Sequence, residues 1–283
     1  MVLKQYGIFL TSIFLAFFIS NNVVTSRNIA FVIDDTASMG LEIDQIKNNI
    51  QSTLKEIIES DVYNIDDVII ITFNDNEIRD KKKHRFVIDS NKEVIKTRAR
   101  SKNVDELYAS IDKIIVGGGG RCPEPVLLGI ERALEECSPN SYIYVFTDAS
   151  PSDFKKEEAI ITLAQNKSIQ MNFLLTGKCS QSDIYDVYER LANKSSGEIF
   201  RLRKADVNQM MQFFKYSMRE FKSNILREKI GGDQNFTFTA DDVDEVYIAV
   251  NGYRPKETVN IKVSDPFGYE AIATTVVETN NTK

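Results

Sequence analysis

Short apolar runs alternate with stretches of helical periodicity along most of the chain. Residues 28–33 and 68–73 are almost entirely apolar, as expected for strands that are buried on both faces. Between them, apolar side chains recur every three or four residues at Ile43, Ile46, Ile50, Leu54 and Ile57. This spacing places them on one stripe of a helix. The pattern predicts a buried strand, an amphipathic helix and a second buried strand.

The alternation of strands and helices continues as far as residue 226. Further strands are expected at residues 142–147, 169–175 and 198–202, with a short edge strand at 86–88. Further helices are expected at residues 154–166, 183–193 and 205–226. Strands separated by helices of this length are joined by right-handed crossovers, which gives a mostly parallel sheet with helices on both faces. The predicted fold is an open, doubly wound α/β sandwich.

Two more helices have boundaries that the sequence marks directly. One carries Leu107, Ile111 and Ile114 on a single face and is expected to end at the glycine run of residues 117–120. The next should start near Pro123 or Glu124, since the missing N–H of proline would be unpaired at the first helical position anyway.

The hydrophobic period changes from helical to alternating after two glycines at residues 231–232. Apolar and polar residues then alternate one by one, and an Asn-Gly pair at residues 251–252 suits a hairpin turn. We therefore predict an α/β domain at residues 27–230, followed by a partial β-sandwich-like segment at residues 234–283.

The first 26 residues have the three-part layout of a secretory signal peptide. Lys4 precedes an apolar run at residues 8–19, and small residues follow up to Ser26, where we expect cleavage. A membrane anchor is the alternative, but a spanning helix needs roughly 20 apolar residues and this run is shorter. Secretion would make four Asn-x-Ser/Thr tripeptides candidates for glycosylation, at Asn166, Asn193, Asn235 and Asn280.

Composition excludes several functional classes. The 283 residues carry a formal net charge of −6, which does not favour nucleic acid, because phosphate binding needs a basic face. The single histidine, His84, cannot build a zinc site of imidazoles, and three cysteines cannot form a four-cysteine site. The basic run around His84 is interpreted as a solvated loop.

Oxygen-bearing side chains follow two of the predicted buried strands. Asp34, Thr36 and Ser38 come directly after the first strand, and Asp148 follows the strand at residues 142–147. Ligands of open α/β sheets bind outside the carboxyl ends of the strands. Carboxylate and hydroxyl oxygens suit Mg²⁺, Mn²⁺ or Ca²⁺ rather than a thiophilic metal. The sequence predicts a cation site at this edge of the sheet.

The Asp-x-Thr-x-Ser pattern at residues 34–38 and the strand-ending Asp148 resemble the metal-ion-dependent adhesion site (MIDAS) of von Willebrand factor A domains. Residues 31–39, 117–124, 142–149 and 175–179 are similar to the A domain of hemicentins, which are extracellular matrix proteins. The resemblance covers roughly residues 28–226. It implies that Asp34, Thr36 and Ser38 hold Mg²⁺ or Ca²⁺, that Asp148 acts in the outer shell, and that an acidic side chain of a protein partner completes the coordination.

One position departs from this family pattern. Where the family supplies a further oxygen ligand after the glycines, this chain has Arg121, whose guanidinium is always protonated and cannot bind a cation. Arg121 could pair with Asp34 and Asp148 and block the site, whereas Glu124 could restore ligation if Arg121 points outward. The alternatives are a working cation site and a degenerate site that serves as a scaffold.

Two of the three cysteines occur at positions of the hemicentin-like pattern, Cys122 after the glycine run and Cys179 after Thr-Gly. The resemblance suggests a disulfide bond between them. Cys137 could equally be the partner of Cys122, be buried unpaired, or bond to another chain, so three connectivities stay open.

Together these features predict a secreted, non-enzymatic adhesion or matrix-interaction protein of the extracellular region. We expect it to bind a protein partner of the matrix or the cell surface and no nucleic acid, and to have no membrane span after cleavage of the signal peptide. A structural matrix component with a cation-free site is the alternative. A phosphatase of the haloacid dehalogenase kind is a remote one, because that chemistry needs a second carboxylate two residues after the nucleophile and this chain has Thr36 there.

Overall fold

The computed structural model describes residues 27–60, 63–75, 77–80, 85–88, 93–119, 122–177 and 182–211, with the single positions 214, 218, 264 and 267. The predicted signal peptide and, apart from two isolated positions, the predicted C-terminal β segment lie outside the described residues. Among the described residues, no helix combines the length and the apolar character that crossing a membrane requires.

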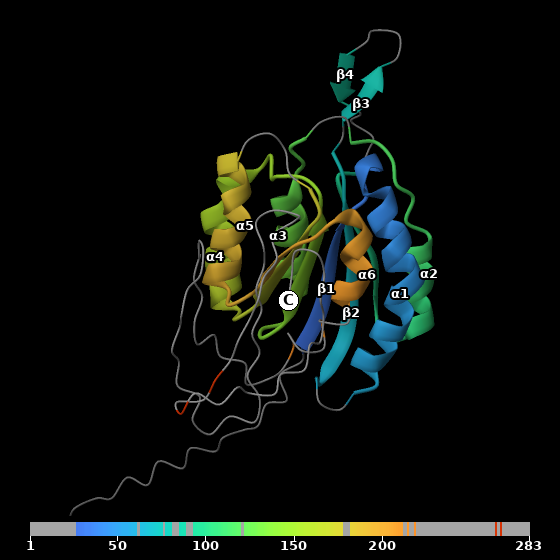
Figure 1. Ribbon diagram of the computed structural model, residues 1–283, viewed down its shortest axis with the longest axis vertical. Coiled ribbons are helices and arrows are strands. Elements are labelled where there is room, and N and C mark those ends of the chain that lie inside the picture. The colour runs from blue at the N-terminus through green and yellow to red at the C-terminus, as the bar shows by residue number, and fades with distance from the viewer. Residues whose placement is uncertain are drawn as a thin grey trace, which may run out of the picture.

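A six-stranded sheet forms the centre of the domain. Its strands follow the order β5 (Ile95–Ser101), β2 (Ile65–Phe73), β1 (Arg27–Asp34), β6 (Tyr142–Thr147), β7 (Gln170–Leu175) and β8 (Ile199–Arg201). All neighbours pair in parallel except β2 and β5, which are antiparallel. The chain reverses its direction of winding at β1, as the doubly wound prediction requires, and the fold is confirmed (Figure 1).

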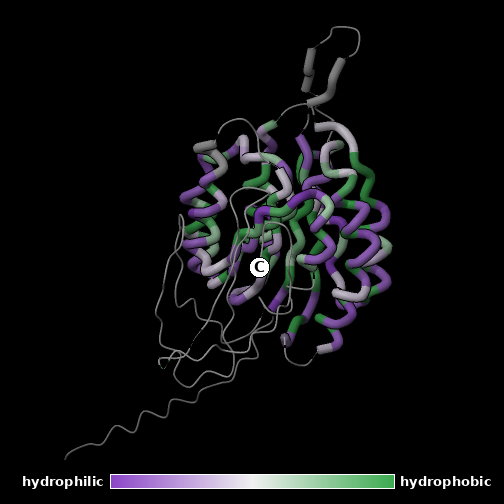
Figure 2. The backbone as a smooth tube through the Cα atoms, in the orientation of Figure 1, coloured by the Kyte–Doolittle hydropathy of each residue, from purple (hydrophilic) through white to green (hydrophobic). Residues whose placement is uncertain are grey.

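Helices cover both faces of this sheet. One face carries α1 (Gly40–Ile58), α2 (Val104–Asp112) and α6 (Val207–Met211), and the other carries α3 (Val126–Glu136), α4 (Glu157–Asn166) and α5 (Ser182–Lys194) (Figure 1). Side chains of β1 alternate between the two cores, with Phe31 in the first and Val32 in the second. Hydrophobic residues gather along the strands and the inward sides of the helices, as Figure 2 shows.

The predicted helical stripe of α1 is buried along its whole length, and its five members are at most 2% exposed. At the end of the described chain, Phe214 lies against three aromatic rings, with centroid distances of 5.7 Å to Phe31, 4.4 Å to Tyr144 and 6.0 Å to Phe146. These contacts fix the C-terminal end of the described domain onto the central strands.

The strand predicted at residues 86–88 is present, but it does not form an edge of the main sheet. β4 (Arg85–Ile88) pairs with β3 (Glu77–Asp80) in a separate two-stranded hairpin, which projects from the body of the domain (Figure 1). The edge of the sheet beside β2 is formed by β5, whose sequence IKTRARS is rich in charged residues. An edge strand need not be apolar, and the continuous runs that mark the buried strands are therefore missing from it.

Two helix boundaries also differ from the prediction. α2 ends at Asp112, before the glycine run, although Ile114 is buried. α3 begins at Val126 and not at Pro123 or Glu124. The reason is that Glu124 forms an isolated β-bridge with the segment after β6, in which its backbone N–H donates a hydrogen bond to the carbonyl of Ser150.

Asp153, from the segment after β6, then caps the first turn of α3. Its carboxylate accepts hydrogen bonds from the backbone of Leu127 and Leu128 at 3.1 and 2.7 Å. The predicted helix at residues 205–226 is described only in part, as a short turn at Lys204–Asp206 followed by α6.

Candidate functional site

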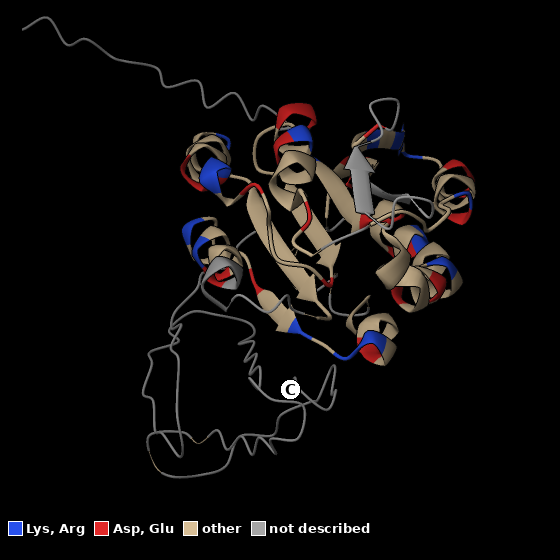
Figure 3. Ribbon diagram, turned by 90° about the horizontal axis from the view of Figure 1, so that it is seen from above, with Lys and Arg blue, Asp and Glu red and all other residues tan. Residues whose placement is uncertain are grey.

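The two central strands carry the predicted site residues to one edge of the sheet. β1 and β6 pair in parallel with Ile33 opposite Phe146, so Asp34 and Thr147 leave the sheet side by side. Thr147 Oγ1 donates a hydrogen bond of 2.7 Å to Asp34 Oδ2, and Asp34 is fully buried. Seen from above, acidic positions lie at the ends of the strands, inside the surrounding helices (Figure 3).

A chain of hydrogen bonds joins all four predicted ligand-bearing residues. Asp34 Oδ1 accepts from the backbone N–H of Thr36 at 3.0 Å and from its hydroxyl at 2.6 Å. Thr36 Oγ1 lies 3.1 Å from Ser38 Oγ, which donates to Asp148 Oδ1 at 3.0 Å. The tight loop after β1 and the end of β6 thus place two carboxylates and two hydroxyls in one contiguous cluster.

Burial makes the charge on Asp34 unfavourable. It raises the pKa of Asp34 to about 6, the negative charge of Asp148 acts in the same direction, and the hydrogen bonds from Thr36 and Thr147 oppose it. A cation placed against this carboxylate would remove that cost. The donor set, which combines carboxylate and hydroxyl oxygens, fits a hard divalent cation.

Asp35 has a different task, which the sequence did not reveal. It faces away from the cluster and holds the glycine loop, since its carboxylate accepts from Asn74 at 2.6 Å and from Arg98 at 2.8 Å. Asn74 also donates to the carbonyl of Gly117, whose N–H bonds to the carbonyl of Asp35 at 3.0 Å. This network fixes the glycine loop beside the residues that follow β1.

The glycine loop passes very close to Thr36. Gly119 has a φ of +66°, and a Cβ atom there would lie 2.6 Å from Thr36 Cβ and 3.4 Å from Glu124 Oε1. Only glycine fits this position. Glu124, which was predicted as a possible replacement ligand, is 4% exposed and therefore buried, and its Oε1 atom lies on the same side of Gly119 as Thr36. Arg121 lies outside the described residues, and its blocking role stays a prediction.

Lys204 and Glu42 complete the cluster, and sequence reasoning missed both. Lys204 Nζ donates to Asp148 Oδ2 at 2.6 Å and to the carbonyl of Ser38 at 2.7 Å, and it lies 2.9 Å from Glu42 Oε1. Glu42 precedes Ile46 by four residues and therefore stands on the apolar stripe of α1, which is a signal for a buried carboxylate. Lys204 follows β8, far away in the sequence, and has no comparable signal.

The cluster combines two carboxylates with two hydroxyl groups. Over the part of the chain that the structure describes, no group of three or more His, Cys, Asp or Glu side chains is arranged for a metal ion. The predicted cation site includes the hydroxyl oxygens of Thr36 and Ser38, which are not among these four residue types.

A family model for the von Willebrand factor A domain matches residues 28–204, which include every element of the sheet and the whole cluster. The chain belongs to the von Willebrand factor A domain family. Mouse hemicentin-2 is 30% identical over 245 residues, which are 85% of this chain and 4% of hemicentin-2. Human hemicentin-1 is 29% identical over 255 residues, 86% of this chain and again 4% of the relative. The A-domain chain thus spans a small part of the length of these matrix proteins.

Among solved structures, this A domain is similar to proximal thread matrix protein 1 from the mussel byssus, in a form whose MIDAS motif is occupied by zinc. The sequences are 15% identical, the TM-score is 0.42, and the match covers 67% of this chain and 45% of the mussel protein.

The other predicted residues lie away from the cluster or outside the described part of the A domain. Cys137 is a free, buried thiol, and burial raises its pKa to about 12. Cys137 is therefore not bonded to Cys122. The partner that the resemblance suggests for Cys122, Cys179, lies outside the described residues. Asn166 and Asn193 are exposed, and Asn235 and Asn280 lie outside the described residues, as does His84.

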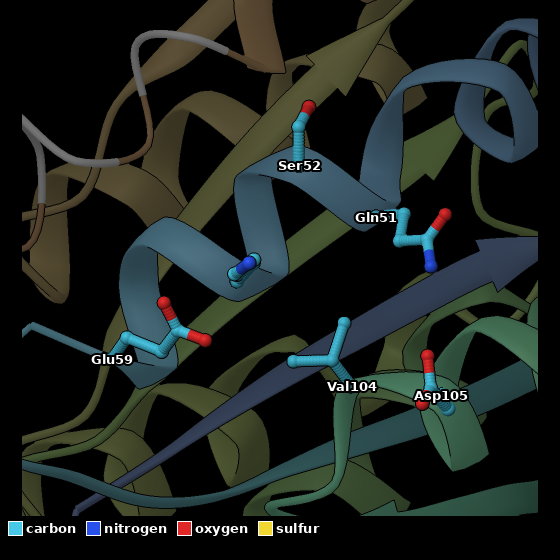
Figure 4. Close-up of a pocket in the computed structure, with 6 residues that line it drawn as sticks. Gln51, Ser52, Glu59, Val104 and Asp105 are labelled. Atoms are coloured by element: carbon cyan, nitrogen blue, oxygen red, sulfur yellow. The ribbon is translucent and has the colours of Figure 1, made fainter.

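A surface hollow of about 440 Å³ lies between α1 and α2. It is lined by the part of α1 that is remote from Gly40 and by the start of α2, which follows the antiparallel strand β5 (Figure 4). Because α1 runs away from the cluster, the hollow lies toward the opposite edge of the sheet. Its lining is Gln51, Ser52, Lys55, Glu59, Val104 and Asp105.

Proposed function

We propose that this chain is a secreted, non-enzymatic adhesion or matrix-interaction protein, whose A domain binds a protein partner through a divalent cation. The observation that carries the proposal is the hydrogen-bond chain from Asp34 through Thr36 and Ser38 to Asp148. These residues would hold Mg²⁺ or Ca²⁺, with Asp34, Thr36 and Ser38 nearest to it and Asp148 behind Ser38. The bound cation would supply positive charge to which an acidic side chain of the partner can coordinate.

Burial supports the same proposal. Asp34 has no access to solvent, and two hydroxyls and one backbone N–H orient its carboxylate. Ser38, in contrast, is exposed. The cluster therefore runs from a buried anion to an exposed hydroxyl, which would leave one side of a bound cation open to a group from outside.

Exposed apolar side chains near this edge support a protein partner rather than a free carboxylic acid. Leu41, in the first turn of α1, is 52% exposed, and Ile115, shortly before the glycine loop, is 83% exposed. A partner surface that presents one carboxylate with apolar neighbours would contact both kinds of group. Interfaces typically combine a central polar anchor with surrounding apolar contacts.

The similarity to hemicentins supports an extracellular, matrix-associated role for this chain. We include in the proposal the signal peptide at residues 1–26, the disulfide bond between Cys122 and Cys179, and glycosylation at the four predicted asparagines. Expression in a secreting eukaryotic cell tests these three points together. We expect a chain that begins at Arg27, loses mass on deglycosylation, and yields a Cys122–Cys179 peptide in a non-reducing digest. Retention in the cell or an intact N-terminus would contradict secretion.

A structural matrix protein with a cation-free site is the second candidate. The observation that favours it is the ammonium of Lys204, which already neutralises Asp148. If the guanidinium of Arg121 also reaches this edge, two fixed cations could replace a divalent one.

Calorimetric titration with Mg²⁺ and with Ca²⁺ distinguishes the two candidates. We expect the secreted chain to bind a cation and the Asp34→Asn variant to bind none. Asp44→Asn, the same substitution at an exposed position of α1, is the matched control and should bind as the parent does. If only Arg121→Asp binds, Arg121 silences the site and the structural candidate is correct. If neither the parent nor Arg121→Asp binds, the proposed cation site is wrong.

A further inference from the structure

Lys204 occupies a position that the proposed cation site does not explain. Its ammonium contacts three oxygens, one each from Asp148, Ser38 and Glu42, at 2.6 to 2.9 Å. Two of these residues, Asp148 and Ser38, belong to the hydrogen-bonded cluster. Lys204 reaches them from the short turn that follows β8. The side chain is 37% exposed, so solvent reaches it although its two carboxylate partners, Asp148 and Glu42, are largely buried.

Glu42 depends on this ammonium. It is fully buried, and its Oε1 atom accepts from Thr176 Oγ1 at 2.6 Å in addition to Lys204. Its second oxygen, Oε2, is buried without a hydrogen-bond partner among the described residues. A buried carboxylate without an opposite charge is strongly destabilising. Lys204 is therefore required for the charge balance of the cluster before any cation arrives.

The environment keeps Lys204 charged. The carboxylates of Asp148 and Glu42 lie 2.6 and 2.9 Å from the ammonium, and opposite charges at these distances favour its charged form. The main chain at Lys204 is also fixed, because Gln45 of α1 donates to its carbonyl. The ammonium is thus a permanent positive charge in a fixed place.

We propose that Lys204 is the built-in counter-ion of this edge and sets its affinity for divalent cations. It pairs with both Asp148 and Glu42 in the cation-free protein, which offsets part of their negative charge, and it opposes the entry of a second positive charge beside Asp148. This inference rests on the proposed function, since it concerns the same cluster. It adds that the chain binds its cation more weakly than the oxygen ligands alone would allow.

Removal of the charge separates this role from a purely structural one. The Lys204→Met variant keeps most of the apolar stem and loses the ammonium. We expect it to bind Mg²⁺ or Ca²⁺ at least roughly tenfold more tightly than the parent. A unit charge about 6 Å from a divalent ion has an effect of this size at the dielectric constant of water, and the effect is larger where burial lowers the dielectric constant. Lys204→Arg keeps the charge and should stay near the parent. Lys55→Met removes the same charge at the far end of α1 and is the control.

Thermal unfolding in EDTA gives a second readout that needs no cation. Lys204→Met leaves Glu42 buried and unpaired, so its melting temperature should fall, and the double variant Glu42→Gln/Lys204→Met should recover most of the loss. If Lys204→Met merely lowers the melting temperature and leaves the cation affinity unchanged or weaker, Lys204 is structural and the inference is overturned.

The pattern of binding also separates the inference from the proposed function. A parent that binds, together with a Lys204→Met variant of equal affinity, overturns the inference and leaves the proposed function intact. If the parent binds no cation and the Lys204→Met variant does, the inference is supported and cation binding by the native chain is overturned. If neither binds, both are wrong.

Discussion

Replacement of Asp34 by asparagine tests the electrostatics of the cluster in the cation-free protein. Asp34 is fully buried and accepts hydrogen bonds from Thr36 and Thr147. Burial raises its pKa from 3.8 to about 6 in spite of these bonds. The ionised carboxylate is therefore less favourable in the folded chain than in the unfolded chain, and Asp34→Asn should remove this cost.

The direction of the pH dependence follows from the raised pKa. Between about pH 4 and pH 6 the folded chain binds more protons at Asp34 than the unfolded chain does, so this residue's contribution to stability decreases as the pH rises. Above about pH 6 the full cost applies, and the difference between the two pKa values corresponds to about 3 kcal/mol. Below about pH 4 both states are protonated and the cost disappears.

Asparagine can keep most of the hydrogen bonds. Its Oδ1 atom can accept from the backbone and hydroxyl of Thr36, and its Nδ2 atom can donate to Thr147 Oγ1, although bonds to a neutral amide are weaker than bonds to a carboxylate. After a loss of roughly 1 to 2 kcal/mol for this weakening, we expect a net gain of about 1 to 2 kcal/mol near neutral pH. That gain corresponds to a rise in melting temperature of roughly 2 to 8 °C for a domain of this size.

Differential scanning calorimetry in EDTA at several pH values between about 4 and 7.5 measures this effect, with Asp44→Asn as the exposed control. The advantage of Asp34→Asn should shrink as the pH falls to about 4. In excess Mg²⁺ the order should reverse, because only the parent gains stability from bound cation. A variant that is less stable than the parent in EDTA near neutral pH, or an advantage that does not depend on pH, would refute the reasoning.

Three further outcomes are expected. Gly177→Ala places a Cβ atom 2.7 Å from the carbonyl oxygen of Asp148 and should weaken cation binding in calorimetry, whereas Gly117→Ala meets nothing within 4 Å; equal affinities would show that Asp148 is not displaced. Phe214→Ala should lower the free energy of unfolding by about 3 to 5 kcal/mol in urea titrations, and a loss under about 1 kcal/mol would contradict the aromatic packing. Cys137 should resist iodoacetamide in the native chain and react in urea, because it is buried and its pKa is raised; rapid native labelling would contradict its placement.

The central part of the fold could be predicted because its strands are buried on both faces. Such strands carry a continuous apolar run, as at residues 29–33 of β1, 68–71 of β2 and 142–146 of β6, and the helices between them show their buried stripe at a fixed spacing. β5 could not be found in this way, since it lies at an edge and carries three basic residues. Its polar sequence is typical of loops as well as of edge strands.

The same distinction applies to the candidate site. Asp34 and Asp148 each follow a recognisable strand, and the parallel pairing of those strands brings them to one edge. Lys204 reaches the cluster only because the turn after β8 folds back onto α1, and this depends on tertiary packing. Asp35 stands next to Asp34 in the sequence, but its contacts come from Arg98 of β5, a strand that the pattern did not predict, and from Asn74, the residue after β2.

The two halves of the cluster stand on elements of unequal local stability. Asp34 and Asp148 follow central strands that are covered by helices on both sides, so the amide hydrogens of β1 and β6 should exchange only when the whole domain unfolds. Lys204 follows β8, which is three residues long and lies at the margin of the sheet, where partial opening requires less free energy. The positions of Asp34 and Asp148 are thus stable, whereas Lys204 can move away from them when the edge of the sheet at β8 opens transiently. Each such opening would expose the bare carboxylates to ions in solution.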